Sequence, residues 1–293
     1  TCRRAFPRRR ACLRRRARLH FGAARVTRPR VAPGSRSRLK RRPAPRRQPV
    51  GPRGAKKVAL VTGAARGIGA ATVTRLKADG FEVIEIDRAD DDPRLPYAMG
   101  RGEPGIDEDA LRARIEQAGG ELDVIVAAAG VIAGGVPAWE LDAEQQAAVL
   151  EVNLGGVLAA ARVGVPALLK RPEPREGRFI AVASTAATRG LPMLAAYCAA
   201  KAGVVGFVRA LAVELGGTGV TANTVSPGST RTAILDESAR LYDLESAEAF
   251  AAQQPLGRLI EPEEVAAVIA FLASPQSRAV TGADYAVDGG LSL

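Results

Sequence analysis

A tyrosine and a lysine four residues apart provide the clearest chemistry in this 293-residue sequence. Tyr197 and Lys201 lie in a strongly helical stretch at 195–216, so this spacing places both side chains on one face of the predicted helix. A phenol titrates at about pH 10 in water, which makes it a poor proton-transfer group at neutral pH. A neighbouring ammonium group favours the phenolate and lowers the phenol pKa. The pair therefore predicts a tyrosine that exchanges a proton with a substrate.

Two further polar residues precede this pair in the chain. Ser184 ends a predicted strand 13 residues before Tyr197, and Asn153 lies 31 residues before Ser184 in a long helical stretch. Asn153 could alternatively be an ordinary buried helical asparagine. The single histidine, His20, lies in a basic segment ahead of the folded part. This placement excludes Ser-His-Asp hydrolysis, Cys-His proteolysis and histidine-ligated zinc there, and we expect no metal site.

A glycine-rich turn, TGAARGIG at 62–69, stands between the first predicted strand and its helix. In a dinucleotide-binding turn, Gly63 permits the sharp exit from the strand and Gly67 lets the backbone approach a pyrophosphate. Gly69 lets the helix pack closely on the sheet. The amides at the helix start, near Arg66 and Ile68, then face the phosphates together with the positive end of the helix dipole. The turn predicts a bound dinucleotide cofactor.

An aspartate at the end of the second predicted strand bears on the choice of that cofactor. Asp87 lies 18 residues past Gly69, where a carboxylate can accept both ribose hydroxyls and would repel a 2′-phosphate. Arg66 and Arg88 favour the opposite choice, because either could reach toward a phosphate. Asp87 could also be a helix cap or an exposed loop acid. We expect the carboxylate to outweigh the arginines, so the sequence predicts NAD rather than NADP.

Strands and helices alternate from Lys56 onward, which predicts one doubly wound α/β domain over residues 56–293, a Rossmann fold with a parallel sheet and helices on both faces. Between Asp87 and a predicted helix near 107–118 stand three prolines and no strand-like run, so a third strand is expected to be truncated or missing. The expected strands are 56–62, 81–86, 122–128, 178–184, 220–226 and 283–289, and the clearest helices are 142–170, 195–216 and 262–273.

The charge of the chain is unevenly distributed. Residues 1–55 hold 20 of the 42 Lys and Arg and none of the Asp and Glu, whereas the other 238 residues hold 22 Lys and Arg against 31 Asp and Glu. So much like charge with so little apolar surface predicts a disordered leader. It could be a nucleic-acid-binding arm, a transit peptide, or upstream sequence of a GC-rich gene joined by start-site misassignment. We favour the third interpretation, because the acidic folded part argues against a nucleic-acid partner and the leader is poor in serine.

Two other sequence features bear on location. No run of about 18 apolar residues appears, so no membrane-spanning helix is expected. Cys2, Cys12 and Cys198 are too few and too scattered for a disulfide framework, which is typical of a reducing compartment such as the cytoplasm.

Taken in order, these motifs resemble those of the classical short-chain dehydrogenase/reductases. The resemblance rests on the TGxxxGIG turn, AAAG at 127–130, Asn153, Ser184, the Tyr197-x-x-x-Lys201 pair and Pro227-Gly228, and it covers nearly all of 56–293. It implies an NAD-dependent enzyme, a homo-oligomeric tetramer or dimer, in which hydride passes between a substrate carbon and the nicotinamide.

The resemblance also implies a role for each matched residue. Ser184 holds the substrate oxygen beside Tyr197, while Asn153 kinks its helix and holds a water in a proton relay to Lys201. Ala129 and Gly130 lie along the cofactor, and Pro227 and Gly228 shape the turn below the nicotinamide. Thr230 and Thr232 match positions that meet the carboxamide and the diphosphate, and Asp107 matches an aspartate that contacts adenine.

One departure concerns the AAAG motif, in which Ala127 replaces an asparagine that normally ties neighbouring strands. Several segments more specifically resemble the mycofactocin-coupled subfamily, in which an insertion after the second strand buries the NAD and a mycofactocin-type redox partner recycles it in place. The segments are DRADDDPRLPY (87–97), VIVAAAGVIAGG (124–135), LAAYCAAK (194–201) and VSPGSTRTAILDESARLYDLESAEAF (225–250). This chain keeps only the start of that insertion. An ordinary dehydrogenase with exchangeable NAD(P), acting on a cyclic diol or acyl ketone, is therefore the alternative.

The segment 229–260 is expected to form a lid over the substrate. Its large side chains make it apolar, which suggests a hydrophobic secondary alcohol or ketone, although the same stripe could be a packing face. These side chains are Ile234, Leu235, Leu241, Tyr242, Leu244 and Phe250.

Overall fold

The computed structural model describes residues 56–87 and 107–293, and within these residues six parallel strands form one sheet. The strands lie in the order β2-β1-β3-β4-β5-β6. The six strands predicted from the sequence are confirmed, while the stretch expected to lack a strand lies outside the described residues. The bounds are β1 Lys57–Thr62, β2 Phe81–Ile86, β3 Val124–Ala127, β4 Arg178–Val182, β5 Thr221–Pro227 and β6 Asp284–Val287.

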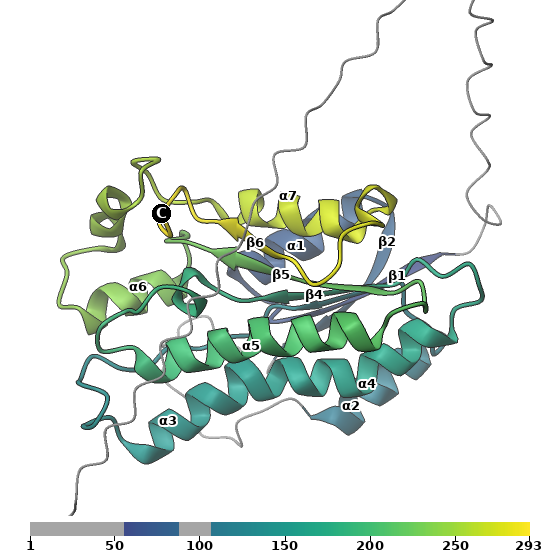
Figure 1. Cartoon of the computed structure of the whole chain (residues 1–293), viewed down its shortest axis with the longest axis horizontal. Helices are drawn as coiled ribbons and strands as arrows, with labels where there is room; N and C mark the ends of the chain where they lie inside the picture. The colour runs from purple at the N-terminus through teal and green to yellow at the C-terminus, as the bar shows by residue number, and fades with distance from the viewer. Residues whose placement is uncertain (1–55, 88–106) are drawn as a thin grey trace, which may run out of the picture. The chain divides into compact units, whose positions relative to one another are not determined.

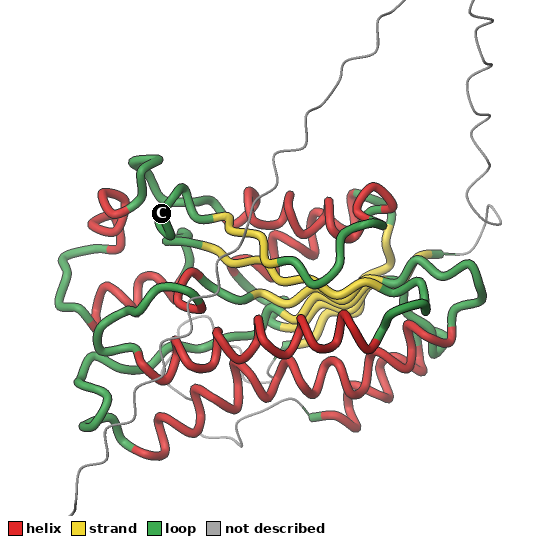
Figure 2. The backbone as a smooth tube through the Cα atoms, viewed as in Figure 1, coloured by secondary structure: helices red, strands yellow, loops and turns green. Residues whose placement is uncertain are grey.

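Helices cover both faces of this sheet, as expected for a doubly wound fold (Figure 1). One face is covered by α1 (Gly67–Ala78) and α7 (Pro262–Ala273), and the other by α2 (Glu108–Gln117), α4 (Gly156–Lys170) and α5 (Ala195–Glu214). Figure 2 shows the strands as a layer between these helices. The remaining helices are α3 (Ala143–Leu150), α6 (Ala233–Leu241), the π-helical η1 (Glu151–Gly155) and the 3₁₀ helices η2 (Thr185–Ala187), η3 (Ala247–Gln253) and η4 (Pro275–Ser277).

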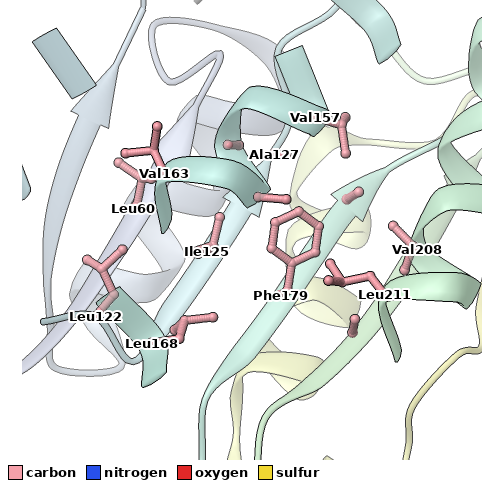
Figure 3. Close-up of a cluster of buried hydrophobic side chains, with 14 of the residues drawn as sticks. Leu60, Leu122, Ile125, Ala127, Val157, Val163, Leu168, Phe179, Val208 and Leu211 are labelled. Atoms are coloured by element: carbon pink, nitrogen blue, oxygen red, sulfur yellow. The ribbon is translucent and has the colours of Figure 1, made fainter. Parts of the chain in front are cut away.

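The alternation of side chains along each strand divides the core into two layers. In β1, Val58 and Leu60 pack with residues of α2, α4 and α5, whereas Ala59 and Val61 pack with α1 and α7. Phe179 of β4 is fully buried in the first layer, where it lies among side chains of β3, α4 and α5 (Figure 3). Because both faces are covered, the strands are apolar almost throughout, which is why short apolar runs located them in the sequence.

Two helical stretches, 143–170 and 195–214, are long and apolar enough to span a membrane by length and composition alone. The expectation of no membrane-spanning helix stays a prediction, because the core helices of globular proteins meet the same criteria of length and composition. In the most apolar 18-residue segment of each stretch, 56% and 50% of the residues are buried in the fold. Their buried residues include Ala160 and Val204 of the first core layer, so packing on the sheet accounts for their apolar composition.

The strand order places a crevice at the carboxyl end of the sheet. The chain passes from β1 to β2 on one side of β1 and then returns to β3 on its other side. At such a reversal the connections leave in opposite directions, and the crevice between them is where ligands bind in open α/β sheets. The turns that follow β1 and β3 contain the glycine-rich turn and the AAAG motif, so the topology brings both motifs together.

Candidate active site

A cleft of about 1030 Å³ opens at the carboxyl ends of the strands. Apart from Asn153, it is lined by every residue that the sequence analysis assigned to catalysis or cofactor binding. These are Gly63, Arg66, Gly67, Ile68, Gly69, Asp87, Asp107, Ala129, Gly130, Ser184, Tyr197, Lys201, Pro227, Gly228, Thr230 and Thr232.

The glycines of the turn after β1 are required by close backbone packing. Gly63 has a positive φ of 68°, and a Cβ there would lie 2.7 Å from the backbone of Ala129. A Cβ on Gly69 would lie only 1.8 Å from the carbonyl oxygen of Gly63. Gly67 has a φ of 52° and would crowd the methyl group of Thr232 at 3.1 Å. Glycine at these positions therefore allows β1, β3 and α1 to meet at the bottom of the cleft.

The first turn of α1 is suited to an anion. Its N-cap residue, Arg66, makes no side-chain cap hydrogen bond, and no acidic residue occupies this first turn. By contrast, Asp107, Asp142 and Thr232 cap α2, α3 and α6 with their side chains. The first amides of a helix have no partner within the helix and attract negative charge. The N-terminus of α1, which lines the cleft, thus fits a phosphate group.

Two acids predicted to contact a cofactor lie at the same end of the cleft. Asp87 Oδ2 accepts a hydrogen bond of 2.6 Å from the Ala65 amide, which fixes the carboxylate against the glycine-rich turn. Asp107 Oδ1 accepts hydrogen bonds of 3.0 Å from the amides of Asp109 and Ala110. Asp107 therefore has a structural role as the cap of α2 in addition to its place in the cleft wall. Arg88 lies outside the described residues.

The threonine of the glycine-rich turn links the ends of β1 and β3. Thr62 Oγ1, at the end of β1, accepts hydrogen bonds from the amides of Ala128 at 3.2 Å and Ala129 at 3.4 Å. Ala127 itself contributes only a buried methyl group. These bonds tie the two strand ends together, a role of Thr62 that the sequence analysis missed.

Asn153 lies in η1, the π-helical segment that joins α3 to α4. Its Nδ2 donates to the carbonyl oxygens of Val149 at 2.8 Å and Val131 at 2.9 Å. The side chain is fully buried, and its Oδ1 has no hydrogen-bond partner within the described part of the chain. A Cβ on Gly130 would lie 3.0 Å from this Oδ1 and 3.6 Å from Lys201 Nζ, so both polar atoms face Gly130 behind the cleft.

Lys201 is buried beside Tyr197, as the helical spacing predicts. The lysine is 4% exposed and the tyrosine 8% exposed. Lys201 Nζ donates a hydrogen bond of 2.9 Å to the carbonyl oxygen of Val182 and lies 5.7 Å from the centroid of the Tyr197 ring. Burial lowers the pKa of Lys201 from 10.5 to about 8. At neutral pH the group therefore keeps its positive charge and can stabilise a phenolate.

Ser184 follows β4 and begins the short helix η2. Its hydroxyl oxygen accepts a hydrogen bond of 3.1 Å from the amide of Ala186, and its carbonyl oxygen accepts one of 2.9 Å from Ala187. These bonds fix the serine at the cleft wall that also contains Tyr197.

The turn after β5 depends on a glutamine that the sequence analysis missed. Gln254 is 2% exposed, and its Oε1 accepts a hydrogen bond of 2.9 Å from the Ser229 amide. Its Nε2 donates to the carbonyl oxygen of Arg258 at 2.6 Å. A Cβ on Gly228 would lie 2.5 Å from the glutamine Oε1, so only glycine fits there. No spacing rule in the sequence indicates this contact, because it joins residues 25 positions apart across a loop.

The segment predicted as a lid contributes α6 and η3 to the cleft wall. Leu235 and Phe250 line the cleft and also form a small buried cluster with Leu259, so the apolar stripe both faces the cleft and packs internally. Tyr242, just after α6, donates its hydroxyl to the Pro192 carbonyl oxygen at 2.7 Å. This bond joins the lid to the loop that follows η2.

Comparison with known proteins places the chain in a family. A family model described as enoyl-(acyl carrier protein) reductase matches residues 106–292, and one described as short chain dehydrogenase matches residues 57–99. A cis-4-hydroxycyclohexanecarboxylate dehydrogenase from Sinomonas cyclohexanicum is 39% identical over 247 residues, which cover 80% of this chain and 96% of that protein.

Solved structures agree with this placement. Carveol dehydrogenase from Mycobacterium avium in complex with NAD has a TM-score of 0.72 and 30% identity, covering 81% of this chain and 98% of that one. A 3-ketoacyl-(acyl-carrier-protein) reductase from Brucella melitensis complexed with NADH has a TM-score of 0.70 and 31% identity over the same shares. The chain belongs to the short-chain dehydrogenase/reductase family, whose members are oxidoreductases. The family expected from the sequence motifs is confirmed.

The buried Lys201 predicts a characteristic dependence of stability on pH. Its folded-state pKa of about 8 lies below the value in an unfolded chain, so the unfolded state binds more protons between the two values. Relative to a Lys201→Met variant, the free energy of unfolding of the wild type should therefore rise as pH increases above about 8. Urea denaturation at matched ionic strength measures this difference. Replacement of the exposed Lys77 by Met serves as the control, and parallel curves for wild type and Lys201→Met would contradict the assignment.

Proposed function

We propose that this chain is a cytoplasmic, homo-oligomeric, NAD-dependent dehydrogenase that interconverts a hydrophobic secondary alcohol and its ketone. The observation that supports it most strongly is the convergence of Ser184, Tyr197 and Lys201 on a cleft that also contains the uncapped N-terminus of α1. Bound NAD would supply the hydride acceptor at its nicotinamide ring, and NADH the donor for the reverse reaction.

Three polar side chains of the site have separate roles in proton transfer. In the oxidation direction, Tyr197 takes the proton of the substrate hydroxyl, and in reduction it returns a proton to the carbonyl oxygen. The ammonium group of Lys201 stabilises the phenolate form of Tyr197. The Ser184 hydroxyl donates a hydrogen bond to the substrate oxygen and so holds it within reach of the phenol.

Asn153 extends this proton path to the interior. Its Oδ1 is a buried acceptor that faces the same glycine as Lys201 Nζ, and a buried polar atom of this kind is commonly satisfied by an ordered water. We assign Asn153 to hold such a water in a relay that exchanges protons with Lys201. The π-helical geometry of η1 turns the asparagine toward Val131 and Gly130.

The backbone of the cleft fits the cofactor at several points. The glycine-rich turn and the first amides of α1 would hold the pyrophosphate. Pro227 and Gly228 would support the nicotinamide, and Thr230 and Thr232 stand at the start of α6 near the carboxamide and diphosphate. Thr232 Oγ1 donates to the carbonyl oxygen of Thr230 at 3.2 Å and accepts from the Leu235 amide at 3.4 Å, which fixes the side chain at the start of α6.

Asp87 favours NAD over NADP in this arrangement. Its carboxylate is fixed by the Ala65 amide at the end of β2, where the ribose of a dinucleotide would lie. A 2′-phosphate would bring negative charge against this carboxylate, and the repulsion is stronger in a cleft than in open water.

We also propose coupling to a mycofactocin-type redox partner, which rests on the segments of subfamily resemblance rather than on the cleft. Ordinary exchange of free NAD is the alternative. The two differ in whether the cofactor leaves the protein after each turnover.

Replacing Tyr197 by Phe removes the proton-transfer group but little volume. Turnover should fall by about 10²- to 10⁴-fold, while NAD affinity stays near the wild-type value, because the loss concerns the chemical step. Initial rates and fluorescence titration with NADH measure the two quantities. Retention of more than about a tenth of the activity would exclude Tyr197 as the acid–base group.

Replacing Asp87 by Ser should raise the ratio of kcat/KM for NADP to that for NAD, because a repelling charge is removed. Asp87→Asn is the matched control, since it keeps an acceptor for the Ala65 amide and removes only the charge. Both variants should shift the ratio in the same direction. A wild-type protein that already prefers NADP would show that the ribose assignment of Asp87 is wrong.

The exchange of bound NAD(H) with free NAD tests the proposed redox coupling. Under the mycofactocin proposal, purified protein should contain NAD(H) that survives gel filtration and does not exchange with added isotopically labelled NAD. Mass spectrometry of the denatured protein gives the label content. Rapid and complete exchange would favour the ordinary dehydrogenase.

A further inference from the structure

The wall of the cleft on the Ser184 side contains an exposed cation that the mechanism does not use. Arg189 lies five residues after Ser184, and its amide donates a hydrogen bond of 2.9 Å to the carbonyl oxygen of Thr185. This bond closes the turn that begins at Ser184, so the position of Arg189 is fixed relative to the serine hydroxyl.

The guanidinium group of Arg189 is only partly engaged. Its Nη1 donates a hydrogen bond of 2.7 Å to the carbonyl oxygen of Leu291, another residue of the cleft wall. Within residues 56–87 and 107–293, Arg189 makes no ion pair, whereas Arg171, Arg231 and Arg258 each pair with at least one carboxylate. The remaining N–H donors of Arg189 have the fork geometry that matches a carboxylate.

The surroundings of Arg189 in the cleft are apolar and free of acid. The lining residues from 182 to 291 include no Asp or Glu in the described chain, and most of them are apolar. The other lining cations lie elsewhere, because Arg66 and Arg114 belong to α1 and α2 and Lys201 is buried. The apolar lining residues on this side include Leu191, Leu194, Ile234, Leu235, Tyr242, Leu244, Phe250 and Leu291.

We propose that Arg189 is the specificity-determining residue that binds an anionic group, a carboxylate, on a substrate whose alcohol or ketone lies at Ser184 and Tyr197. This inference rests on the proposed function and names its substrate class, an apolar ring or chain that has a carboxylate several bonds from the reacting carbon. The carboxylate takes a charge-assisted hydrogen bond from the guanidinium, while the carbon skeleton lies against the apolar wall.

The test compares a charged substrate with an uncharged one of the same shape. The probes are 4-hydroxycyclohexanecarboxylate and 4-hydroxycyclohexanecarboxamide, assayed with the full-length protein and NAD. Wild type should prefer the carboxylate, and Arg189→Met should lower kcat/KM for it by about 10- to 100-fold while leaving the carboxamide little changed. Arg189→Lys should retain part of the preference for the carboxylate, because lysine keeps the positive charge but lacks the planar N–H donors that bind a carboxylate bidentately. Arg75→Met, which removes an exposed arginine of α1, should behave as wild type.

A binding measurement separates this inference from the proposed function. Calorimetric titration with cyclohexanecarboxylate should show binding to wild type that is weakened in Arg189→Met, whether or not the protein turns over any alcohol. If neither probe reacts but this binding difference is present, the anion site stands and the dehydrogenase proposal fails. If both substrates lose activity equally in Arg189→Met, or if wild type does not distinguish carboxylate from carboxamide, the inference is overturned.

Discussion

The close approach of two strand ends, β1 and β3, is the constraint on which the rest of the site depends. With glycine at position 63, the backbone after β1 can pass against Ala129 at a distance that no side chain would allow. Thr62 strengthens the contact by accepting two amides from the turn after β3. Because these turns meet, the N-terminus of α1 faces the same space as Gly130, and the residues behind Gly130 gain access to the cleft. The residues proposed for cofactor binding and for proton transfer thus share one backbone junction.

The charged side chains of the cleft lie in separate regions, and each region therefore suits a different part of a ligand. Carboxylates occur at the end formed by β2 and α2, where Asp87 and Asp107 are held by backbone amides. A buried cation lies in the middle, where Lys201 has only a carbonyl oxygen as its hydrogen-bond partner in the described structure. Among the residues that the structure describes, the cleft wall from Val182 to Leu291 contains no acid and has an exposed guanidinium at Arg189. A protein interior stabilises an isolated charge poorly, so each charge here is placed where a ligand or a neighbouring dipole can compensate it.

The sequence predicted the fold and most of the site because their signals are local. Apolar runs located the six strands, and the four-residue spacing of Tyr197 and Lys201 placed both on one helix face. Contacts that join distant segments had no such signal. The bond from Gln254 to the turn at Ser229, and that from Arg189 to Leu291, depend on how loops fold over the sheet. The apolar composition of the helices at 143–170 and 195–214 follows from their packing on one face of the sheet, where residues such as Ala160 and Val204 are buried.

The π-helical segment η1 has a further consequence for how this enzyme can vary. An α-helix turns by about 100° per residue, whereas a π-helical turn takes up an additional residue, so α3 and α4 are out of phase by one position. Loss of a single residue from Glu151–Gly155 would restore a regular helix, but it would rotate the contact face of α3 away from α5 by roughly a quarter of a turn. The number of residues between Asp142 and Gly156 therefore sets the rotation of α3 relative to α4. An inserted or deleted residue here would disturb the contact of α3 with α5 and move Asn153 from its place behind Gly130.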